Sequence, residues 1–470
     1  MRSLEIFSGA GGLAKGLERA GFEHAAFVEF NKHACSSLRR NFEAEKVFEG
    51  DIRDFDFLQL SGIDVVAGGP PCQPFSLGGK HGANNDTRDM FPYAINAIET
   101  LTPKAFVFEN VKGLLRQSFS EYLHYIILRL TFPDAHPALK ATWYEHFKSL
   151  ERINFDTYAG IKYRVQKQLV DAADYGVPQN RERVVIVGIR SDIDAFWNFP
   201  KPTHSHERLL WDKFVTDSYW DAHKVPKNER EACPSAWLPR LSELRSTFGF
   251  FVPEFKAWRT VRDALKGVPD PRADHGISDH IYRGGARTYA GHTGSDLDSP
   301  AKTIKAGGHG VPGGENMMRF RDGTVRYFTV YEAKLIQTFP KDFVILGAWG
   351  EALRQIGNAV PVMLGKSIGT ALISAISKQV PSRDSARMHK AESLAGTNGT
   401  EVHYSVVDAD DGHVLREELE AKTATSIRRS VDYRVTPNPK KTIGQRKQKK
   451  TPGNRGKGRE RGKGQENRDQ

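Results

Sequence analysis

The sequence predicts an α/β fold with a doubly wound, mostly parallel sheet and a second, smaller domain. Three features of the 470-residue chain support this prediction. Short apolar runs alternate with helical patterns through the first 110 residues, a glycine-rich stretch follows the first apolar run, and irregular, tryptophan-rich sequence interrupts the later regular pattern. Strands that alternate with helices are typical of a parallel sheet covered by helices on both faces.

The individual elements of the first region follow from its apolar runs. Strands are expected at 3–8, 24–30, 46–52, 64–69 and 105–110. Helices are expected at 12–21 and at 31–42, where Asn31 is a suitable N-cap. Residues 114–155 have helical potential, and the runs 163–176 and 181–190 are expected to close this region as a hairpin-like pair of strands.

The sequence changes character twice after this region. Residues 191 to about 300 contain five of the seven tryptophans and show no clear period, which predicts a smaller domain of irregular structure. The regular pattern returns at 326–378, with one helix expected up to Pro340 and further helix after Ala352. Beyond Pro381 the chain becomes polar.

The net charge of +11 lies almost entirely in the C-terminal tail. Residues 434–470 hold 13 Lys plus Arg and 3 Asp plus Glu, or +10, which leaves +1 for residues 1–433. A tail with so few apolar residues is expected to be disordered. It either binds polyanions non-specifically or serves as a solubilising extension.

The cysteine content and the apolar runs limit the class of protein. Three widely spaced cysteines argue against a disulfide framework and against a cysteine-rich zinc site, and they favour a reducing cytosol. The N-terminus lacks a signal-peptide pattern and no run of 18 apolar residues occurs. We therefore expect a soluble cytoplasmic protein that does not interact with a membrane.

The stretch "GAGGLA", which includes Gly9 and Gly11, fits the glycine pattern of nucleoside-binding loops. Glu29 ends the next strand, where a carboxylate can bind ribose hydroxyls. Asp51 follows the third strand and could accept from an adenine amino group, while Ile52 packs on the ring. This logic is shared by NAD enzymes and S-adenosylmethionine enzymes. Alternatively, the glycines are simple turn residues and Asp51 caps the next turn.

Cys72 lies in "GGPPCQPFS", just past the end of a predicted buried strand. Two prolines before it fix the backbone and prevent a helix or central strand there. The carboxyl end of a strand in an open α/β sheet is where ligands bind. This stretch by itself is equally compatible with a rigidly held thiol at a ligand site and with a small buried hydrophobe, the usual role of a free cysteine.

Two further motifs place charge beside apolar strands. Glu109 ends the strand "AFVFEN", where a partly desolvated carboxyl group can donate a proton. Gln179, Arg181 and Arg183 follow one another at spacing two, so they are expected to share one face of a strand. Buried arginines need acceptors, and a salt-bridged sheet edge is the alternative to a functional site.

These stretches together resemble the DNA (cytosine-5) methyltransferases, in particular those of bacterial restriction–modification systems. Five motifs occur in the order of that family: "PPCQPFS", "ENVKG", "QNRER", "RYFTVYEAKLIQTFP" and "QIGNAVP". The resemblance covers residues 3 to about 190 and 320 to 378. It leaves the middle domain and the tail unmatched.

The resemblance implies a Rossmann-like sheet that binds S-adenosylmethionine, and no metal. It divides the chain into a catalytic domain (1–190), a target-recognition domain (191–320), a return segment that completes the catalytic domain (321–380) and a polar extension with the basic tail (381–470). The cofactor-binding residues that it implies are Phe7, Gly9, Gly11, Glu29, Asp51, Ile52, Pro71 and Asn358.

The resemblance also implies a mechanism. Cys72 would add to C6 of a flipped-out cytosine, and Glu109 would protonate or hydrogen-bond N3. Arg183 would hold the base carbonyl oxygen and orient Glu109, while Arg181 and Arg183 would favour the thiolate. The glycine-rich loop at 77–91 could close over the base. The expected DNA contacts are Gln73, Ser76 and Arg88.

The expected partner is double-stranded DNA, with a cognate restriction endonuclease that acts on the same site without a stable complex, and we expect a monomer. Three alternatives are weaker. The family's tRNA-directed branch carries a Cys-Phe-Thr stretch that is absent here. An NAD-dependent oxidoreductase would leave Cys72, Glu109 and the arginines without roles, and a non-catalytic relative would not need all of them.

Overall fold

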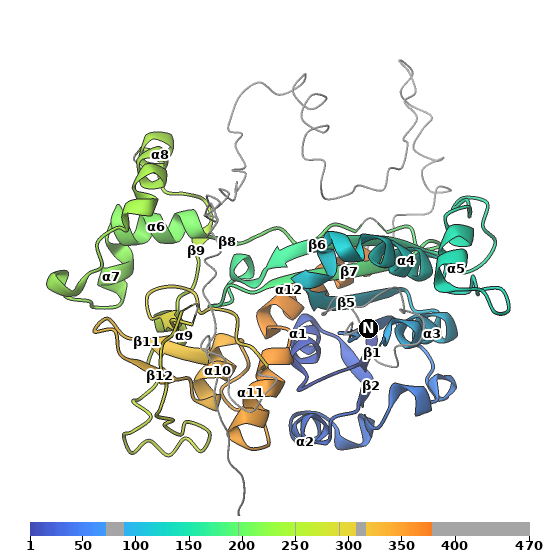
Figure 1. The fold of residues 1–470 in the computed structure, drawn as a ribbon, viewed down its shortest axis with the longest axis horizontal. Helices are drawn as coiled ribbons and strands as arrows, with labels where there is room; N and C mark the ends of the chain where they lie inside the picture. The colour runs from blue at the N-terminus through green and yellow to red at the C-terminus, as the bar shows by residue number, and fades with distance from the viewer. Residues whose placement is uncertain (72–88, 196, 250, 291, 307–315, 378–470) are drawn as a thin grey trace, which may run out of the picture. The chain divides into compact units, whose positions relative to one another are not determined.

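The computed structural model describes residues 1–377, with gaps at 72–88, 196, 250, 291 and 307–315. Its centre is a seven-stranded sheet in the order β3-β2-β1-β4-β5-β7-β6 (Figure 1). The strands are β1 (Arg2–Ile6), β2 (Glu23–Glu29), β3 (Val47–Glu49), β4 (Val65–Gly68), β5 (Ala105–Val111), β6 (Tyr163–Asp171) and β7 (Glu182–Arg190). The first five run parallel, whereas β7 is antiparallel to both β5 and β6. The predicted mostly parallel sheet and its closing hairpin are confirmed.

Helices cover both faces of this sheet because successive strand residues point to opposite sides. Val65 and Ala67 pack against α1 (Gly12–Ala20) and α12 (Val362–Ser377) on one face. Val66 packs on the other face, in a core shared with α3 (Phe91–Leu101) and α4 (Ser120–Thr131). The remaining helices of this part are α2 (Lys32–Asn41) and α5 (Trp143–Leu150).

The last described helix, α12, returns to pack directly on α1. The contact is close, because a Cβ added at Gly16 would lie 2.7 Å from the backbone of Gly365. By length and composition the stretch Trp349–Ser377 could cross a membrane, but 56% of its apolar window is buried inside the protein. That degree of burial is typical of a core helix.

The middle of the chain is more regular than the sequence predicted. It contains α6 (His206–Phe214), α7 (Ser218–Ala222) and α8 (Leu238–Phe248), besides the short pairing of β8 (His204–Ser205) with β9 (Lys256–Ala257). The expectation of irregular structure was wrong for these helices. Leu209 of α6 packs into one apolar cluster and its neighbours Leu210 and Trp211 into another. Because two sides of α6 are buried, its apolar residues show no single helical stripe.

The remaining elements surround a third core. They are α9 (Val261–Ala264), β10 (Ser295–Asp296), β11 (Met317–Arg319), β12 (Val325–Tyr327), α10 (Val330–Ile336) and α11 (Trp349–Asn358). The helix expected up to Pro340 ends at Ile336, shortly before Thr338 adopts a left-handed φ of 61°. The helix expected after Ala352 is interrupted between α11 and α12. Val261 and Ile304 share this core with Phe328, so packing with the return segment begins well before residue 320.

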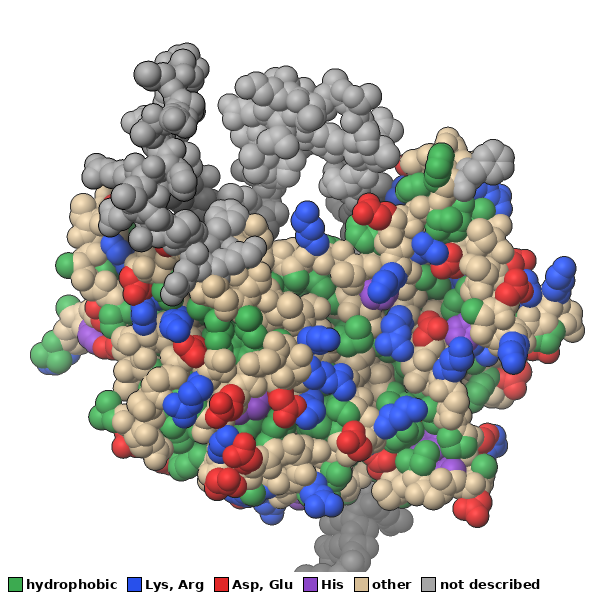
Figure 2. All heavy atoms as spheres, turned by 180° about the vertical axis from the view of Figure 1, so that it is seen from behind, with side chains coloured by type: hydrophobic (Ala, Val, Ile, Leu, Met, Phe, Trp, Pro, Cys, Tyr) green, Lys and Arg blue, Asp and Glu red, His purple; other side chains and the backbone are tan. Residues whose placement is uncertain are grey.

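Charges of both signs are interspersed over the surface that Figure 2 shows. This agrees with the net charge of +1 for residues 1–433. The basic tail lies outside the described residues.

Candidate active site

Glu109 and Arg183 form an ion pair across the antiparallel strands β5 and β7. The Arg183 Nε lies 2.6 Å from Glu109 Oε1, and each side chain is only 11% exposed. In the strand register Glu109 stands opposite Val185, and Arg183 stands opposite Val111. The two charged residues are therefore diagonal neighbours on one face, as the sequence-based mechanism requires.

The backbone that leads to Cys72 lies beside Glu109 and is bonded to the next residue, Asn110. Asn110 Nδ2 donates to the Pro70 carbonyl at 3.0 Å, and Asn110 is buried. A Cβ added at Gly69 would lie 3.5 Å from Glu109 Oε2. Pro71 is exposed, and its carbonyl accepts from the Met90 amide at 3.3 Å. Cys72 is the next residue, but Cys72, Gln73, Ser76 and Arg88 lie outside the described residues.

A second group of predicted residues gathers at the carboxyl ends of β1 and β2. Glu29 Oε2 accepts from the Gly9 amide at 2.7 Å, and Oε1 accepts from the Asn31 amide at 2.8 Å. Burial raises the pKa of Glu29, although these amides and Arg354 oppose the shift. Gly9 and Gly11 have left-handed φ values of 54° and 83°. Glycine adopts this conformation without strain.

The other predicted cofactor residues take different positions. Phe7 has a left-handed φ of 52° and is half-buried against the core. Ile52 is buried in that core. Asp51 caps the short helix η2 (Ile52–Asp54) through the Arg53 amide, and the Arg53 side chain lowers its pKa. Asn358 is exposed at the end of α11.

Arg181 and Gln179 are fully buried. They precede β7 rather than lie on it, so their spacing of two does not place them with Arg183 on one strand face. The Gln179 Oε1 accepts from the Ile304 amide at 3.1 Å. Arg181 donates to three main-chain carbonyls, one of them that of Ile304. Burial lowers the pKa of Arg181 to about 9, so its guanidinium remains charged at neutral pH.

Sequence reasoning missed two residues of this region. Asn110 directly follows Glu109 in the quoted "ENVKG" motif. A polar side chain inside an otherwise apolar strand could have identified it as a residue with a specific hydrogen-bond partner. Thr303 donates to the Asn180 carbonyl at 2.7 Å. Nothing local marks that contact, because the two residues are distant in the sequence.

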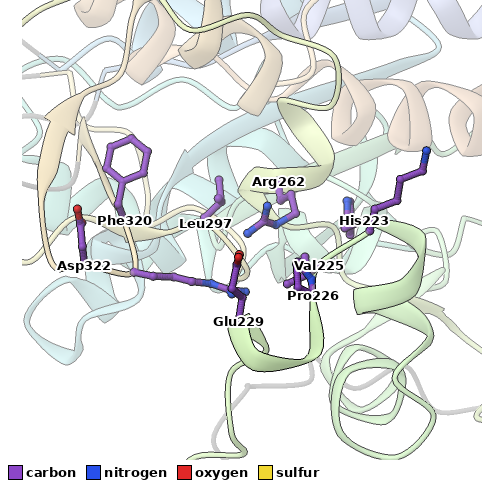
Figure 3. Close-up of a pocket in the computed structure, with 10 residues that line it drawn as sticks. His223, Val225, Pro226, Glu229, Arg262, Leu297, Phe320 and Asp322 are labelled. Carbon is purple, nitrogen blue, oxygen red and sulfur yellow. The ribbon is translucent and has the colours of Figure 1, made fainter.

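A separate pocket of about 360 Å³ is lined by residues of the middle region and of the segment that follows it, between His223 and Asp322 (Figure 3). Its charged lining mixes signs, with Arg262, Glu229 and Asp322 among the labelled residues. None of the predicted site residues is among those that line it.

The family profile of the C-5 cytosine-specific DNA methylases matches residues 1–133 and 145–374. The chain belongs to this family. It is therefore a DNA (cytosine-5-)-methyltransferase. The match includes the middle region, which the motifs alone had left unmatched.

Curated relatives agree with this assignment. The methyltransferase is 33% identical over 373 residues to the type II methyltransferase M.PspPI of a Psychrobacter species, covering 79% of this chain and 78% of the relative. It is 30% identical over 383 residues to the type II methyltransferase M.NgoMIV of Neisseria gonorrhoeae, covering 80% and 98%. The methyltransferase is thus of the restriction–modification type.

Solved structures share the fold. A prophage protein of E. coli that is assigned as a DNA modification methyltransferase aligns with a TM-score of 0.50 at 18% identity, covering 80% of this chain and 100% of that one. The Dnmt2 methyltransferase of S. pombe aligns with a TM-score of 0.50 at 14% identity, covering 80% and 98%. These likenesses confirm the predicted α/β methyltransferase fold.

S-adenosylmethionine is the cofactor of this methyltransferase family, and the geometry at the β1 and β2 ends fits it. A Cβ added at Gly9 would meet no atom within 4 Å, so the backbone there faces open space. The Glu29 carboxylate beside it is fixed by two amides and keeps further lone pairs for hydroxyl groups. A glycine-lined space next to a fixed carboxylate suits a nucleoside.

Proposed function

We propose that the methyltransferase modifies C5 of one cytosine within a specific short sequence of double-stranded DNA, through a covalent bond between Cys72 and C6 of a flipped-out base. The observation that carries this proposal is the ion pair of Glu109 with Arg183, together with the bond from Asn110 to Pro70. These contacts hold an acid and a cation beside the backbone that immediately precedes Cys72.

Each residue of this group has a role that matches its chemistry. Addition of the Cys72 thiolate to C6 makes C5 nucleophilic, and Glu109 protonates or hydrogen-bonds N3 to take the charge that develops in the ring. Arg183 orients Glu109 and holds the carbonyl oxygen of the base. When bound, S-adenosylmethionine supplies the methyl group for C5. The C5 proton is then lost to a base such as solvent water, Cys72 leaves C6 as a thiolate, and any proton on N3 returns to Glu109, which restores the ring.

The cofactor would be held at the carboxyl edge of the sheet. Glu29 binds the ribose hydroxyls, and Phe7 and Ile52 contact the adenine. Asp51 still has lone pairs for the amino group, although it caps η2 and pairs with Arg53. Gly9, Gly11, Pro71 and Asn358 complete the site.

The DNA would be bound by the loop after Cys72 and by the middle domain. A base stacked in a duplex is inaccessible to a thiol, so it must leave the stack. Gln73, Ser76 and Arg88 are proposed to contact the DNA. The target-recognition domain (191–320) would select the sequence. In a bacterial cytosol, a monomeric enzyme of this kind would protect host DNA from a cognate endonuclease.

An RNA substrate is the alternative. The fold likeness to S. pombe Dnmt2 does not favour it, because the identity is 14% and a likeness at that level shows the fold alone. The relatives that cover this chain at 30% identity or more carry type II methyltransferase names, which favours DNA.

Bisulfite sequencing of DNA from cells that lack cytosine methylation and express the protein tests the proposal. We expect one short motif to be methylated at one cytosine position. Cys72→Ser should abolish this methylation, because a hydroxyl is a far weaker nucleophile. Cys233→Ser is the matched control and should methylate as the wild type does. An unmethylated genome, or full methylation by Cys72→Ser, would overturn the proposal.

A trapped intermediate tests the covalent step separately. DNA with 5-fluorocytosine at the target should form a denaturation-resistant adduct with the wild type and not with Cys72→Ser, because fluorine cannot leave as a cation. Methylation of normal DNA without any such adduct would contradict the proposed chemistry.

A further inference from the structure

Residues 301–305 lie alongside the segment that enters β7. Ala301 forms a parallel bridge with Gln179, and its amide donates to the Pro178 carbonyl at 2.9 Å. The Asn180 amide donates back to the Ala301 carbonyl at 2.9 Å. Gln179 also bonds to Ile304, and Thr303 bonds to Asn180. Together these contacts between residues 178–180 and 301–304 attach the end of the middle region to the catalytic sheet.

Arg181 links these contacts to the junction between α11 and α12. Its Nη1 donates to the Ile304 carbonyl at 3.2 Å, and its Nη2 donates to the carbonyls of Gly357 at 2.7 Å and Ala359 at 3.0 Å. The side chain is 1% exposed. The two carbonyls at the junction flank Asn358, so one guanidinium contacts both sides of this predicted cofactor residue.

The two segments that Arg181 joins are in direct contact. A Cβ added at Gly357 would lie 2.6 Å from the Ala306 amide nitrogen. Lys305 is itself fixed, because buried Asn316 accepts from its amide and donates to its carbonyl, both at 2.9 Å. A shift of residues 304–306 would therefore displace the end of α11, since no space separates them.

We propose that Arg181 is a positioning residue that couples DNA binding at the end of the middle region to cofactor binding at the end of α11. This inference rests on the proposed function for the two ligands. DNA bound at residues 301–305 would hold them in one position and with them the carbonyls around Asn358, and bound cofactor would hold residues 301–305 in return. Coupling of this kind is reciprocal in binding free energy.

Arginine is suited to this position in a way that lysine is not. A guanidinium presents several donors in fixed directions, whereas an ammonium is a point charge on a flexible stem. Two different nitrogens of Arg181 serve the three carbonyls, whereas lysine carries all its donors on one nitrogen, so we expect at least one carbonyl to lose its donor in Arg181→Lys. Burial disfavours a lysine ammonium more readily than a guanidinium, so Arg181→Lys tests the fixed geometry and the charge of the contact together.

Calorimetry with S-adenosylhomocysteine measures the coupling directly. Its dissociation constant is determined with and without a duplex that contains the motif found by bisulfite sequencing. For the wild type we expect the duplex to tighten binding by about 5-fold or more, within the usual range of coupling between sites. For Arg181→Lys we expect this ratio to fall towards 1.

Arg164→Lys is the matched control. Arg164 also donates to three main-chain carbonyls, those of Ser191, Ile193 and Ala195. It lies on β6 at the far edge of the sheet. A general loss of stability would affect both variants, but only Arg181→Lys should lose the coupling. Thr303→Val removes the bond from Thr303 to Asn180 with little change of shape, and it should also reduce the ratio. It therefore provides the test if Arg181→Lys fails to fold.

The possible results separate the inference from the proposed function. A wild-type ratio of 1, or a ratio unchanged in both Arg181→Lys and Thr303→Val, would overturn the inference alone. An equal loss of coupling in Arg164→Lys would also overturn it. A wild-type protein that methylates no DNA would overturn the proposed function and the inference with it.

Discussion

At the scale of single residues, the candidate active site depends on charged groups that are held in place before any substrate arrives. Glu109 and Arg183 pair at 2.6 Å on neighbouring strands. Glu29 is held by two backbone amides. Side chains fixed in this way lose little freedom when they act, which favours catalysis by a positioned acid.

Glu109→Gln tests the role of the carboxyl group. The amide keeps the shape of the side chain but cannot donate a proton to N3, so we expect the rate of methyl transfer to fall by about 10²- to 10⁴-fold. Binding of S-adenosylhomocysteine should be unchanged. Radiolabelled methyl transfer and calorimetry measure the two quantities. Glu182→Gln, at an exposed residue paired with Lys112, is the control, and an equal loss there would count against a specific role for Glu109.

At the scale of elements, the catalytic sheet is completed by a helix from the other end of the described chain. α12 packs on α1 so closely that both helices use glycine at the contact. The glycine turn that is proposed to bind the nucleoside immediately precedes α1. The position of this turn therefore depends on a helix that lies more than 340 residues further along the chain.

Gly16→Ala tests this helix contact. The added methyl group would lie 2.7 Å from the backbone of Gly365, and overpacking of this kind costs about 1–3 kcal/mol of stability. Gly350→Ala adds the same group in α11, where it would meet no atom within 4 Å, and should leave stability unchanged or slightly raised. Urea unfolding compares the two variants. Equal stability would show that the helices can separate without cost.

Asp174 gives a prediction for the dependence of stability on pH. It lies in the short helix η7 (Ala172–Tyr175) and accepts from Trp258 Nε1 at 2.9 Å. Burial raises the pKa of Asp174 to about 6, the bond from Trp258 opposes the shift, and Asp171 and Glu207 add to it. The folded state therefore holds its proton up to a higher pH than the unfolded state does. This residue's contribution to stability is present below about pH 4 and is lost as the pH rises through about 6.

Asp174→Asn should remove this pH dependence. At pH 7 to 8 we expect the free energy of unfolding to rise by about 1–2 kcal/mol, after allowance for the partial solvent screening of a half-buried group. Asp156→Asn, at an exposed position, should leave the profile unchanged. Urea unfolding between pH 4 and 8 measures both. A steeper decline of stability with pH for Asp174→Asn than for the wild type would contradict a raised pKa at Asp174.

At the scale of the whole molecule, positive charge is separated from the catalytic part of the chain. Residues 1–433 carry +1 and residues 434–470 carry +10. With so little net charge, the first part would bind DNA through the arrangement of particular residues rather than through its overall charge. The tail has the composition for phosphate contacts without sequence selectivity.

Deletion of residues 434–470 tests this division. The target motif and the turnover rate should be unchanged, while affinity for non-target duplex should fall. The slope of log affinity against log salt should flatten by about 0.9 for each phosphate contact that is lost. Binding isotherms of both proteins between low and moderate salt measure the slope. Identical slopes would show that the tail does not touch DNA and serves as a solubilising extension.

The sequence by itself determined the features that neighbouring residues encode. Alternating apolar runs predicted the strands, and Asn31 was identified as an N-cap, which its bond from the Ala34 amide confirms. Glu109 was placed on its strand correctly, although β5 continues to Val111, two residues beyond it. These predictions succeeded because caps and strand periodicity depend on residues within a few positions of one another.

Only the tertiary structure decided which distant groups meet. The three acceptors of Arg181 lie between 123 and 178 residues away in the chain, and no local pattern specifies them. The helices of the middle region were missed for a related reason, because α6 is buried on two sides by clusters from other segments. Burial and hydrogen-bond partners are properties of the packed chain, so the buried arginine was identified from its sequence motif and its bonding was established by the fold.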